Sequence, residues 1–322
     1  MVTPRIGIAA SLLLAACAHA PEPPPPSAPA ARVAPLEVVS SPDGVQPFVR
    51  AIVAGRPMRL LLDTGAPRSI LPASVVRELG LEITSTTSNA TFRDALGTAF
   101  SLGTVKAVPV RFEGEPLPTA MDFGANDAVE TLAVLSPQDL VEPGWAAVID
   151  LERRELRLEP EPDAVARVGR DGSALRKLTY RTCQEGLWSP RRRVDLRSRP
   201  DLWSRRQRVV SATVSGVSSE LMIDTGASHS ALTRNSSALR SLSDVTGAPS
   251  TTRGHASTGA ALLVQGVGVE FAGAVFFEPL LVLPTSSRCF EGVLGADVLR
   301  HCLVVWAWSS LRVACHAPGH PD

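Results

Sequence analysis

Two stretches of the chain share a pattern that decides the fold. Residues 51–71 read AIVAGRPMRLLLDTGAPRSIL, and residues 212–232 read ATVSGVSSELMIDTGASHSAL. A shift of 161 residues aligns them without a gap. The positions that are identical in both are, in the first copy, Ala51, Val53, Gly55, Leu60, Asp63, Thr64, Gly65, Ala66, Ser69 and Leu71. Such a repeat indicates that one structural unit occurs twice.

Each copy predicts a strand, a glycine turn, and a second strand that runs straight into Asp-Thr-Gly-Ala. The apolar triplets Leu60–Leu62 and Leu221–Ile223 predict strands that are buried on both faces. Asp63 and Asp224 would therefore lie in a region of low dielectric constant, where a carboxylate needs a partner or a function.

A second correspondence supports the first. The segment VLSPQDL at 134–140 lies 159 residues before VLGADVL at 293–299, and apolar strand pairs follow both. Predicted helices are few and short; one covers 72–79, with a proline at its start and a glycine after it. The pattern predicts an all-β chain of two closed β-barrel lobes related by a pseudo-twofold axis.

The predicted lobes cover residues 36–159 and 209–316, with a segment at 160–208 between them and a tail at 317–322. The chain has 322 residues, of which 44% are hydrophobic, so a wholly disordered chain is excluded. Its 32 basic and 32 acidic residues give a net charge of zero, which argues against a nucleic-acid partner.

The Arg-rich part at 176–208 could bind polyanions. A solvated linker, or a platform against the acidic first lobe, is favoured.

The first 17 residues have the pattern of an export signal. Arg5 precedes the apolar stretch Ile6–Leu14, which is too short to cross a bilayer and ends in Leu-Ala-Ala-Cys. This resembles the lipobox of bacterial lipoproteins and implies lipidation of Cys17. Because Ala18 is not aspartate, the resemblance implies the outer membrane, facing the periplasm or the surface. The alternative is an ordinary secretory signal with a chance cysteine. Residues 18–35, rich in proline and alanine, predict an extended spacer.

Four cysteines remain once Cys17 is assigned to lipid. An even number in an exported protein favours two disulfides, with three possible pairings. Cys302 and Cys315 flank an apolar run that would bring them together as a hairpin. We therefore favour Cys302–Cys315 together with Cys183–Cys289.

A zinc site is a weaker interpretation of the same region. It would use the nearby histidines His301, His316 and His320, but the sequence has no Cys-x-x-Cys pair. We expect no metal and no cofactor.

The two Asp-Thr-Gly-Ala motifs, each behind an apolar triplet and before Ser-x-Leu, resemble those of the aspartic proteases. The alanine after the glycine and the segment LPASVVRELGL at 71–81 resemble specifically the retropepsin-like branch. Most members of that branch carry one motif per chain and dimerise. This chain carries both, so a monomer whose lobes pair within one chain is favoured. The segment at 160–208 would also permit the lobes to swap between two chains.

The resemblance implies that Asp63 and Asp224 form the catalytic pair. Two carboxylates about 3 Å apart cannot both ionise, so the pair supplies a base for water and an acid for the leaving amine. Residues Thr64 and Thr225 are implied to bond across the lobe junction. The supporting glycines, which leave room for close backbone approach, are Gly65 and Gly226.

The residues Ala66 and Ala227 stand where pepsin-type enzymes usually have a hydroxyl residue. A hydroxyl there can stabilise the ionised pair, so its absence predicts a less acidic pair and an optimum at about pH 5–7.

An extended substrate is expected to pair with glycine-containing flaps. The candidates are the hairpin at 95–99 around Gly97 and the hairpin at 253–260 with Gly254 and Gly259. Either could be a plain surface hairpin instead.

The sequence departs from the family pattern in the first lobe. Where the family has two apolar residues and a glycine, this chain has Val134-Leu135-Ser136-Pro137. Ser136 either caps a short helix or marks a relaxed lobe. His229, close to Asp224, is expected to be a specificity or surface residue because the mechanism has no role for it.

The leading hypothesis is an aspartic endopeptidase that is tethered to the bacterial cell envelope and cuts extended peptides. A catalytically inactive peptide-binding or scaffolding lipoprotein with the same bilobal groove is the alternative. A third possibility is a polyanion-binding envelope protein that acts through 176–208. The two intact aspartates favour the enzyme, because a binder gains nothing from two carboxylates that repel each other.

Overall fold

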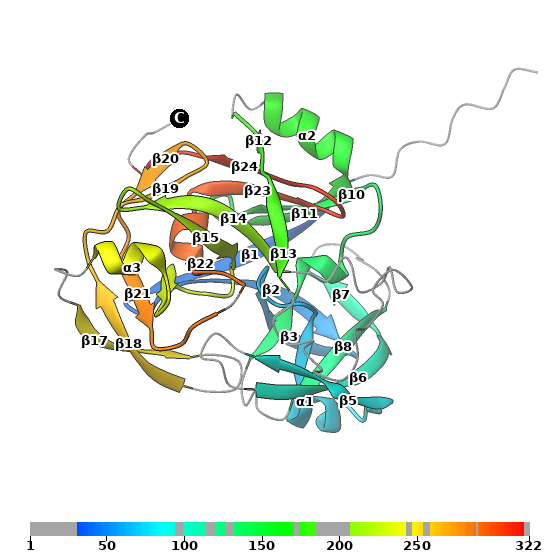
Figure 1. Cartoon of the computed structure of the whole chain (residues 1–322). Helices are drawn as coiled ribbons and strands as arrows, with labels where there is room; N and C mark the ends of the chain where they lie inside the picture. The colour runs from blue at the N-terminus through cyan, green and yellow to red at the C-terminus, as the bar shows by residue number, and fades with distance from the viewer. Residues whose placement is uncertain are drawn as a thin grey trace, which may run out of the picture.

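The computed structural model describes residues 31–93, 99–113, 120–126, 132–170, 174–183, 207–242, 247–253, 258–287 and 289–318. Over these ranges the chain is mostly β, with a few short helices (Figure 1). The sequence positions that lie outside them include Cys17, Gly97, Gly254, His320 and the arginines at 191–193.

The first half of the chain supplies the strands β1 to β11 and the helices α1 and α2. The strands are β1 (Arg32–Ser41), β2 (Gly44–Val53), β3 (Arg56–Leu62), β4 (Ile70–Pro72), β5 (Ser85–Arg93), β6 (Ala99–Val108), β7 (Val110–Phe112), β8 (Met121–Asn126), β9 (Ala133–Leu135), β10 (Trp145–Asp150) and β11 (Glu155–Pro160). The helices are α1 (Ala73–Glu78), the 3-10 turn η1 (Pro137–Asp139) and α2 (Glu161–Arg170).

The second half repeats this order. Its strands are β12 (Arg176–Lys177), β13 (Tyr180–Cys183), β14 (Gln207–Val214), β15 (Val217–Ile223), β16 (Ala231–Thr233), β17 (Ala248–Arg253), β18 (Thr258–Val264), β19 (Val269–Phe271), β20 (Ala274–Phe276), β21 (Leu280–Leu283), β22 (Gly292–Leu294), β23 (Cys302–Ala307) and β24 (Leu311–Cys315). Its helices are α3 (Ser237–Ser241) and α4 (Ala296–Leu299).

The apolar triplets form central strands, as predicted. Leu60–Leu62 lie in β3, which runs parallel to β9, and Leu221–Ile223 lie in β15, which runs parallel to β22. All six side chains are buried. The helix predicted at 72–79 is also present as α1, with Gly80 at a φ of 64° after its end.

The prediction of two closed barrels is wrong. The strands form a 14-stranded sheet and a 10-stranded sheet, and the hairpins β10–β11 and β23–β24 meet each other instead of closing their own lobes. Val148 and Val305, each the fourth residue of its strand, lie opposite one another in β10 and β23. This pairing of equivalent positions is what a twofold axis between the lobes requires.

The inner strands of the two hairpins, β10 and β23, are buried on both faces. We call β1, β10, β11, β23 and β24 the shared sheet. Its central residues Ala146–Ile149 and Val304–Ala307 are almost fully buried. Strands of this kind need neighbours along their edges as well as cover on both faces, and the two hairpins provide edges for each other.

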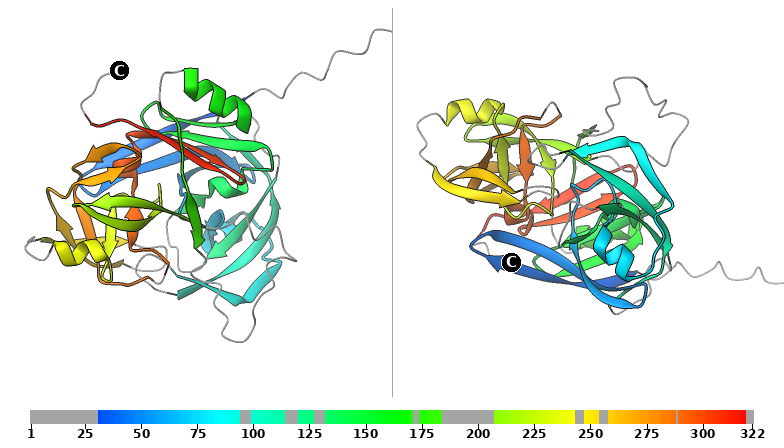
Figure 2. Two further views of the ribbon diagram at one scale, coloured as in Figure 1. Left: turned by 45° about the horizontal axis from the view of Figure 1, so that its top comes forward. Right: turned by 90° about the horizontal axis from the view of Figure 1, so that it is seen from below.

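Part of the segment between the predicted lobes covers this sheet. Helix α2 lies against this sheet (Figures 1 and 2), and its Ala164 and Val168 belong to one buried cluster with Val148 and Val305. The strand β13 pairs with β14, and β12 pairs with β24. Residues 161–170 and 174–183 thus form regular structure with the shared sheet and the second lobe. The exact lobe boundaries stay a prediction.

The chain forms two disulfides, Cys183–Cys289 and Cys302–Cys315, which are the pairs that the sequence favoured. The first ties β13 to the loop before β22, and the second joins the two ends of the hairpin β23–β24.

Within the described ranges, no helix has the length and apolar character needed to cross a membrane. The described side chains also include no cluster of three or more His, Cys, Asp or Glu that could hold a metal.

Candidate active site

The parallel strand pairs place both aspartates at the same position in their lobes. The N–H of Asp63 donates to the carbonyl of Leu135 at 3.0 Å, and the N–H of Asp224 donates to the carbonyl of Leu294 at 3.0 Å. Each Asp-Thr-Gly-Ala loop therefore begins at the end of a parallel strand pair, β3 with β9 in the first lobe and β15 with β22 in the second. Asp63 is only 3% exposed, whereas Asp224 is partly exposed.

The two loops lie against each other across the lobe junction. A methyl group placed on Gly65 would lie 2.5 Å from Cγ of Asp224 and 2.7 Å from each of its carboxyl oxygens. A methyl group on Gly226 would likewise overlap the carboxyl group of Asp63. Each glycine thus leaves the space that the aspartate of the other lobe needs, so the junction brings both carboxyl groups together.

Backbone amides orient the two carboxylates in similar ways. The N–H of Ala66 donates to Oδ1 of Asp63 at 2.7 Å. Oδ1 of Asp224 accepts from Gly226 at 2.9 Å and from Ala227 at 3.1 Å. Hydrogen bonds of this kind favour the charged form of a carboxyl group and fix its direction.

The two threonines bond across the junction. Oγ1 of Thr64 donates to the carbonyl of Ile223 at 3.0 Å and accepts from the N–H of Thr225 at 2.9 Å. Oγ1 of Thr225 donates to the carbonyl of Leu62 at 2.7 Å and accepts from the N–H of Thr64 at 3.1 Å. Both side chains are fully buried, so these four bonds lock the relative position of the lobes.

A second pair of acids supports the loops, and the sequence pattern did not predict it. Asp139 accepts from the N–H of Ser69 at 2.5 Å, and Asp297 accepts from the N–H of Ser230 at 2.8 and 2.9 Å. Both stand in the second repeated segment, but the 159-residue shift pairs Asp139 with Val298. Because the first copy has one residue more, an alignment without gaps does not pair Asp139 with Asp297.

The comparisons with known proteins agree with this geometry in the first lobe. A family model described as a gag-polyprotein putative aspartyl protease matches residues 49–121. The match covers part of the first lobe and includes the first Asp-Thr-Gly-Ala motif. No curated protein matches the chain.

Among solved structures, the chain is similar to the aspartic proteinase from Irpex lacteus, with 12% identity over 89% of this chain and 97% of that one and a TM-score of 0.48. It is also similar to Basic 7S globulin from soybean, with 12% identity over 88% and 94% and a TM-score of 0.47. Neither likeness bears on the activity of this chain.

The structure describes only some of the other residues that the sequence predicted for the site. The hairpins β5–β6 and β17–β18 are present, and Gly259 pairs with Thr252 in the second, while Gly97 and Gly254 lie outside the described residues. The side chain of His229 is 13% exposed, so it is largely but not fully buried, and its Nδ1 lies 3.8 Å from Oδ2 of Asp297. A specificity role for it stays a prediction. Its imidazole stands beside the acid that supports the loop.

The two interpretations of Ser136 can also be compared with the structure. Ser136 does precede a short helix, η1, whose first residue is Pro137. Its side chain makes no capping bond there; instead Oγ donates to the carbonyl of Ala66 at 2.8 Å. Ser136 therefore stands at the N-cap position before Pro137, as predicted, but its side chain does not bond to the helix.

The tip of the β1–β2 hairpin reaches the second Asp-Thr-Gly-Ala loop. The N–H of Val45 donates to the carbonyl of Ser228 at 3.1 Å, and Gly44 lies directly against Ser228. The φ of Gly44 is 102°, which favours glycine. A strand from the first half of the chain thus holds the loop that carries Asp224.

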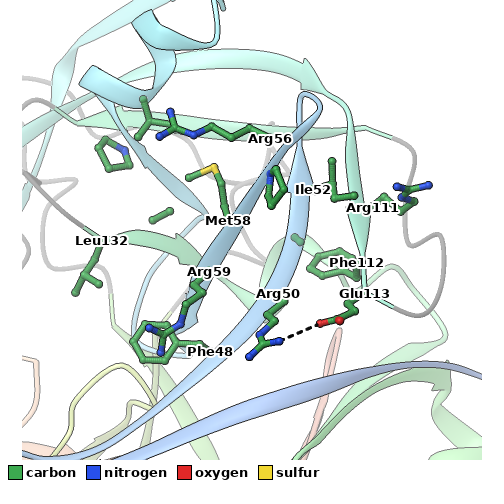
Figure 3. A pocket seen from close by; sticks show the side chains of 15 residues that line it. Phe48, Arg50, Ile52, Arg56, Met58, Arg59, Arg111, Phe112, Glu113 and Leu132 are labelled. Atoms are coloured by element: carbon green, nitrogen blue, oxygen red, sulfur yellow. Dashed lines mark ion pairs between the residues drawn. The ribbon is translucent and has the colours of Figure 1, made fainter.

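A cavity of about 1130 Å³ lies elsewhere, around the β2–β3 hairpin of the first lobe (Figure 3). Neither aspartate lines it. Three of its arginines form ion pairs. Arg50 pairs with Glu37 and Glu113, and Arg56 pairs with Glu78. Arg59 pairs with Glu37 and lies 4.2 Å from the ring centre of Phe48. The cavity is separate from the junction of the two Asp-Thr-Gly-Ala loops.

Two arginines of the 176–208 segment make contacts within the protein. Arg181 pairs with Glu220. Arg208 is buried, donates to the carbonyls of Ala307, Trp308 and Ser310, and lies 4.1 Å from the Trp306 ring centre. Burial lowers the pKa of Arg208 to about 10. Arg208 is therefore not accessible to a polyanion, whereas Arg176, Lys177 and Arg181 are exposed.

Proposed function

We propose that this protein is an aspartic endopeptidase that hydrolyses extended peptide segments, with Asp63 and Asp224 as one catalytic pair. The observation that carries the proposal is the reciprocal contact of the loops, in which Gly65 lies against Asp224 and Gly226 against Asp63. A binding protein would gain nothing from bringing two carboxyl groups to one junction, since they repel when both are ionised.

The chemistry needs no group beyond this pair and a water molecule. Because the two carboxyl groups share one proton, the ionised one takes a proton from water while the other donates to the carbonyl oxygen of the peptide. Collapse of the tetrahedral intermediate then breaks the C–N bond, and the amine leaves with a proton from the pair. The four threonine hydrogen bonds hold both carboxylates in the geometry that these transfers need.

We expect the substrate to lie extended between the lobes, beside the hairpins β5–β6 and β17–β18. Gly97, Gly254 and Gly259 are the proposed flap positions. The chain acts as a monomer in this account, because one chain supplies both aspartates.

Ala66 and Ala227 support an optimum nearer neutrality than that of pepsin-type enzymes. Both contribute a backbone N–H to an aspartate, but neither has a hydroxyl that could stabilise the ionised pair further. We expect the cleavage rate to peak at about pH 5–7. A maximum below about pH 3 would contradict this.

We also propose that the protein is exported and held at the bacterial outer membrane through lipid on Cys17. The two disulfides support an oxidising compartment. Labelling of the expressed chain with a radioactive fatty acid tests this, with Cys17→Ser as the control. Label in wild type alone supports the anchor, and an unlabelled wild type contradicts it.

The activity is tested with a diverse peptide library and residues 21–322, purified with disulfides intact, from about pH 3 to about pH 8. The matched controls are Asp63→Asn and Asp224→Asn. We expect cleavage by wild type and by neither variant. If wild type binds peptides without cleaving them, the alternative of a peptide-binding envelope protein replaces the proposal.

An equimolar mixture of the two variants tests the single-chain site. When both aspartates come from one chain, mixing restores no activity. Recovery of cleavage in the mixture would show that the lobes pair between chains.

A further inference from the structure

The two lobes hold the backbone behind their catalytic loops with different donors. In the second lobe, the carbonyl of Ala227 accepts a hydrogen bond from the N–H of Ala296 at 2.8 Å. Ala227 is the last residue of the Asp-Thr-Gly-Ala motif and itself donates to Asp224. A single backbone bond from the start of α4 therefore ties this loop to the strand–helix junction that follows β22.

The equivalent bond cannot form in the first lobe. The N–H of Ser136 donates to Oγ of Ser69 at 3.0 Å, and the N–H of Gly295 donates to Oγ of Ser230 at 3.0 Å. These matching bonds make Ser136 the counterpart of Gly295, so the next residue, Pro137, is the counterpart of Ala296. Proline has no N–H to donate.

Two side chains occupy the place of the missing donor. Oγ of Ser136 donates to the carbonyl of Ala66 at 2.8 Å, and Nε2 of Gln138 donates to the same carbonyl at 3.2 Å. Their residues are 0% and 4% exposed. Gln138 is also the one residue that the first lobe has in addition, because Asp297 follows Ala296 directly whereas Gln138 separates Pro137 from Asp139.

The second lobe could not use the same solution. A Cβ placed on Gly295 would overlap the backbone of His229, at 2.6 Å from its carbonyl oxygen. A serine at 295 is therefore excluded by the present backbone, and the loop depends on the N–H of Ala296.

We propose that Ser136 and Gln138 are positioning residues that replace the missing backbone donor and hold the first catalytic loop in place. They act through Ala66, whose carbonyl they bind and whose N–H donates to Oδ1 of Asp63 at 2.7 Å. At 136–137, where the sequence departs from the family pattern, two side-chain donors replace one backbone N–H donor. The first lobe is therefore not relaxed. The effect on catalysis rests on the proposed function, but the effect on the loop does not.

The test compares three forms of the full chain, purified in mild detergent: wild type, Ser136→Ala with Gln138→Met, and the same pair with Pro137→Ala. The double variant removes both side-chain donors at nearly constant volume, and the triple variant adds the backbone N–H that the second lobe uses. Hydrogen–deuterium exchange of the segment 60–71 reports on the loop, because the N–H groups of Thr64 and Ala66 are both hydrogen-bonded there.

We expect exchange in 60–71 to be about fivefold faster in the double variant and to return toward the wild-type rate in the triple variant. General stabilisation cannot cause that return, because replacing a proline gives the unfolded chain more freedom. Exchange that is unchanged in the double variant, or not slowed by Pro137→Ala, overturns the proposal. If the double variant does not fold, a triple variant that folds supports the proposal, and one that also fails overturns it.

Peptide cleavage provides the second measurement. We expect kcat to fall about tenfold in the double variant, with KM little changed, and to recover partly in the triple variant. If wild type cleaves no peptide, the proposed activity fails while the exchange result still decides this inference.

Discussion

Replacement of Gly65 by alanine perturbs the junction at its closest point. The added methyl carbon would lie 2.5 Å from Cγ of Asp224, whereas carbon atoms in contact are normally about 3.5–4.0 Å apart. The loops would have to separate by about 1 Å, and a misplacement of that size costs about a hundredfold in rate. Gly65 has no positive φ, so backbone strain adds nothing to this loss.

The assay is kcat for a cleaved peptide, with Gly169→Ala as the matched control. Gly169 lies in α2, and a methyl group there would meet nothing within 4 Å. Alanine should stabilise that helix by about 1 kcal/mol and leave the rate unchanged.

We expect Gly65→Ala to lose about a hundredfold in kcat while near-UV circular dichroism still reports a folded chain. A Gly65→Ala rate within about threefold of the control would refute the argument that the two loops share one site.

Three further predictions concern the framework. Thr225→Val leaves two buried backbone groups of the first lobe without partners, so urea denaturation should give a free energy of unfolding lower by about 2–5 kcal/mol; a loss below about 1 kcal/mol would contradict this. The hydrogen bond from Arg181 is the main cause that lowers the pKa of Glu220 from 4.5, so its stabilising effect is complete above that value and is lost as the pH falls through the lower folded-state pKa. The difference in unfolding free energy between wild type and Glu220→Gln should therefore shrink from about pH 6 to about pH 3, and a constant difference would count against the ion pair. Arg208→Lys should lose about 2 kcal/mol in the same assay, because an ammonium group cannot reproduce the planar set of bonds to three carbonyls; an unchanged stability would show that these bonds contribute nothing.

The sequence predicted the local elements of the site because they depend on short-range patterns. The apolar triplets before Asp63 and Asp224 predicted buried central strands, and the repeat predicted that the two motifs are equivalent. The disulfide Cys302–Cys315 followed from a hairpin whose two ends lie next to each other.

The shared sheet could not be predicted in the same way. Apolar runs such as 146–149 show that a strand is covered on both faces, but the pattern does not say which strand pairs with its edge. Closure within each lobe and pairing between lobes satisfy the same sequence, and the structure has the second arrangement.

The sequence also could not predict the hydrogen bonds that support the two Asp-Thr-Gly-Ala loops. Asp139 and Asp297 stand one residue apart in the aligned copies, so an ungapped comparison separates them. The role of Ser136 becomes visible only when its side chain is seen at the carbonyl of Ala66.

The central claim, that Asp63 and Asp224 act as one unit, is tested most directly by comparing kcat/KM for wild type, Asp63→Asn, Asp224→Asn and the double variant. Residues that act as a unit are strongly non-additive. If the two aspartates act as one unit, we expect each single change to lower kcat/KM by at least about a thousandfold and the double change to lower it no further. Losses that multiply, or a single variant that keeps more than about a tenth of the activity, would contradict it.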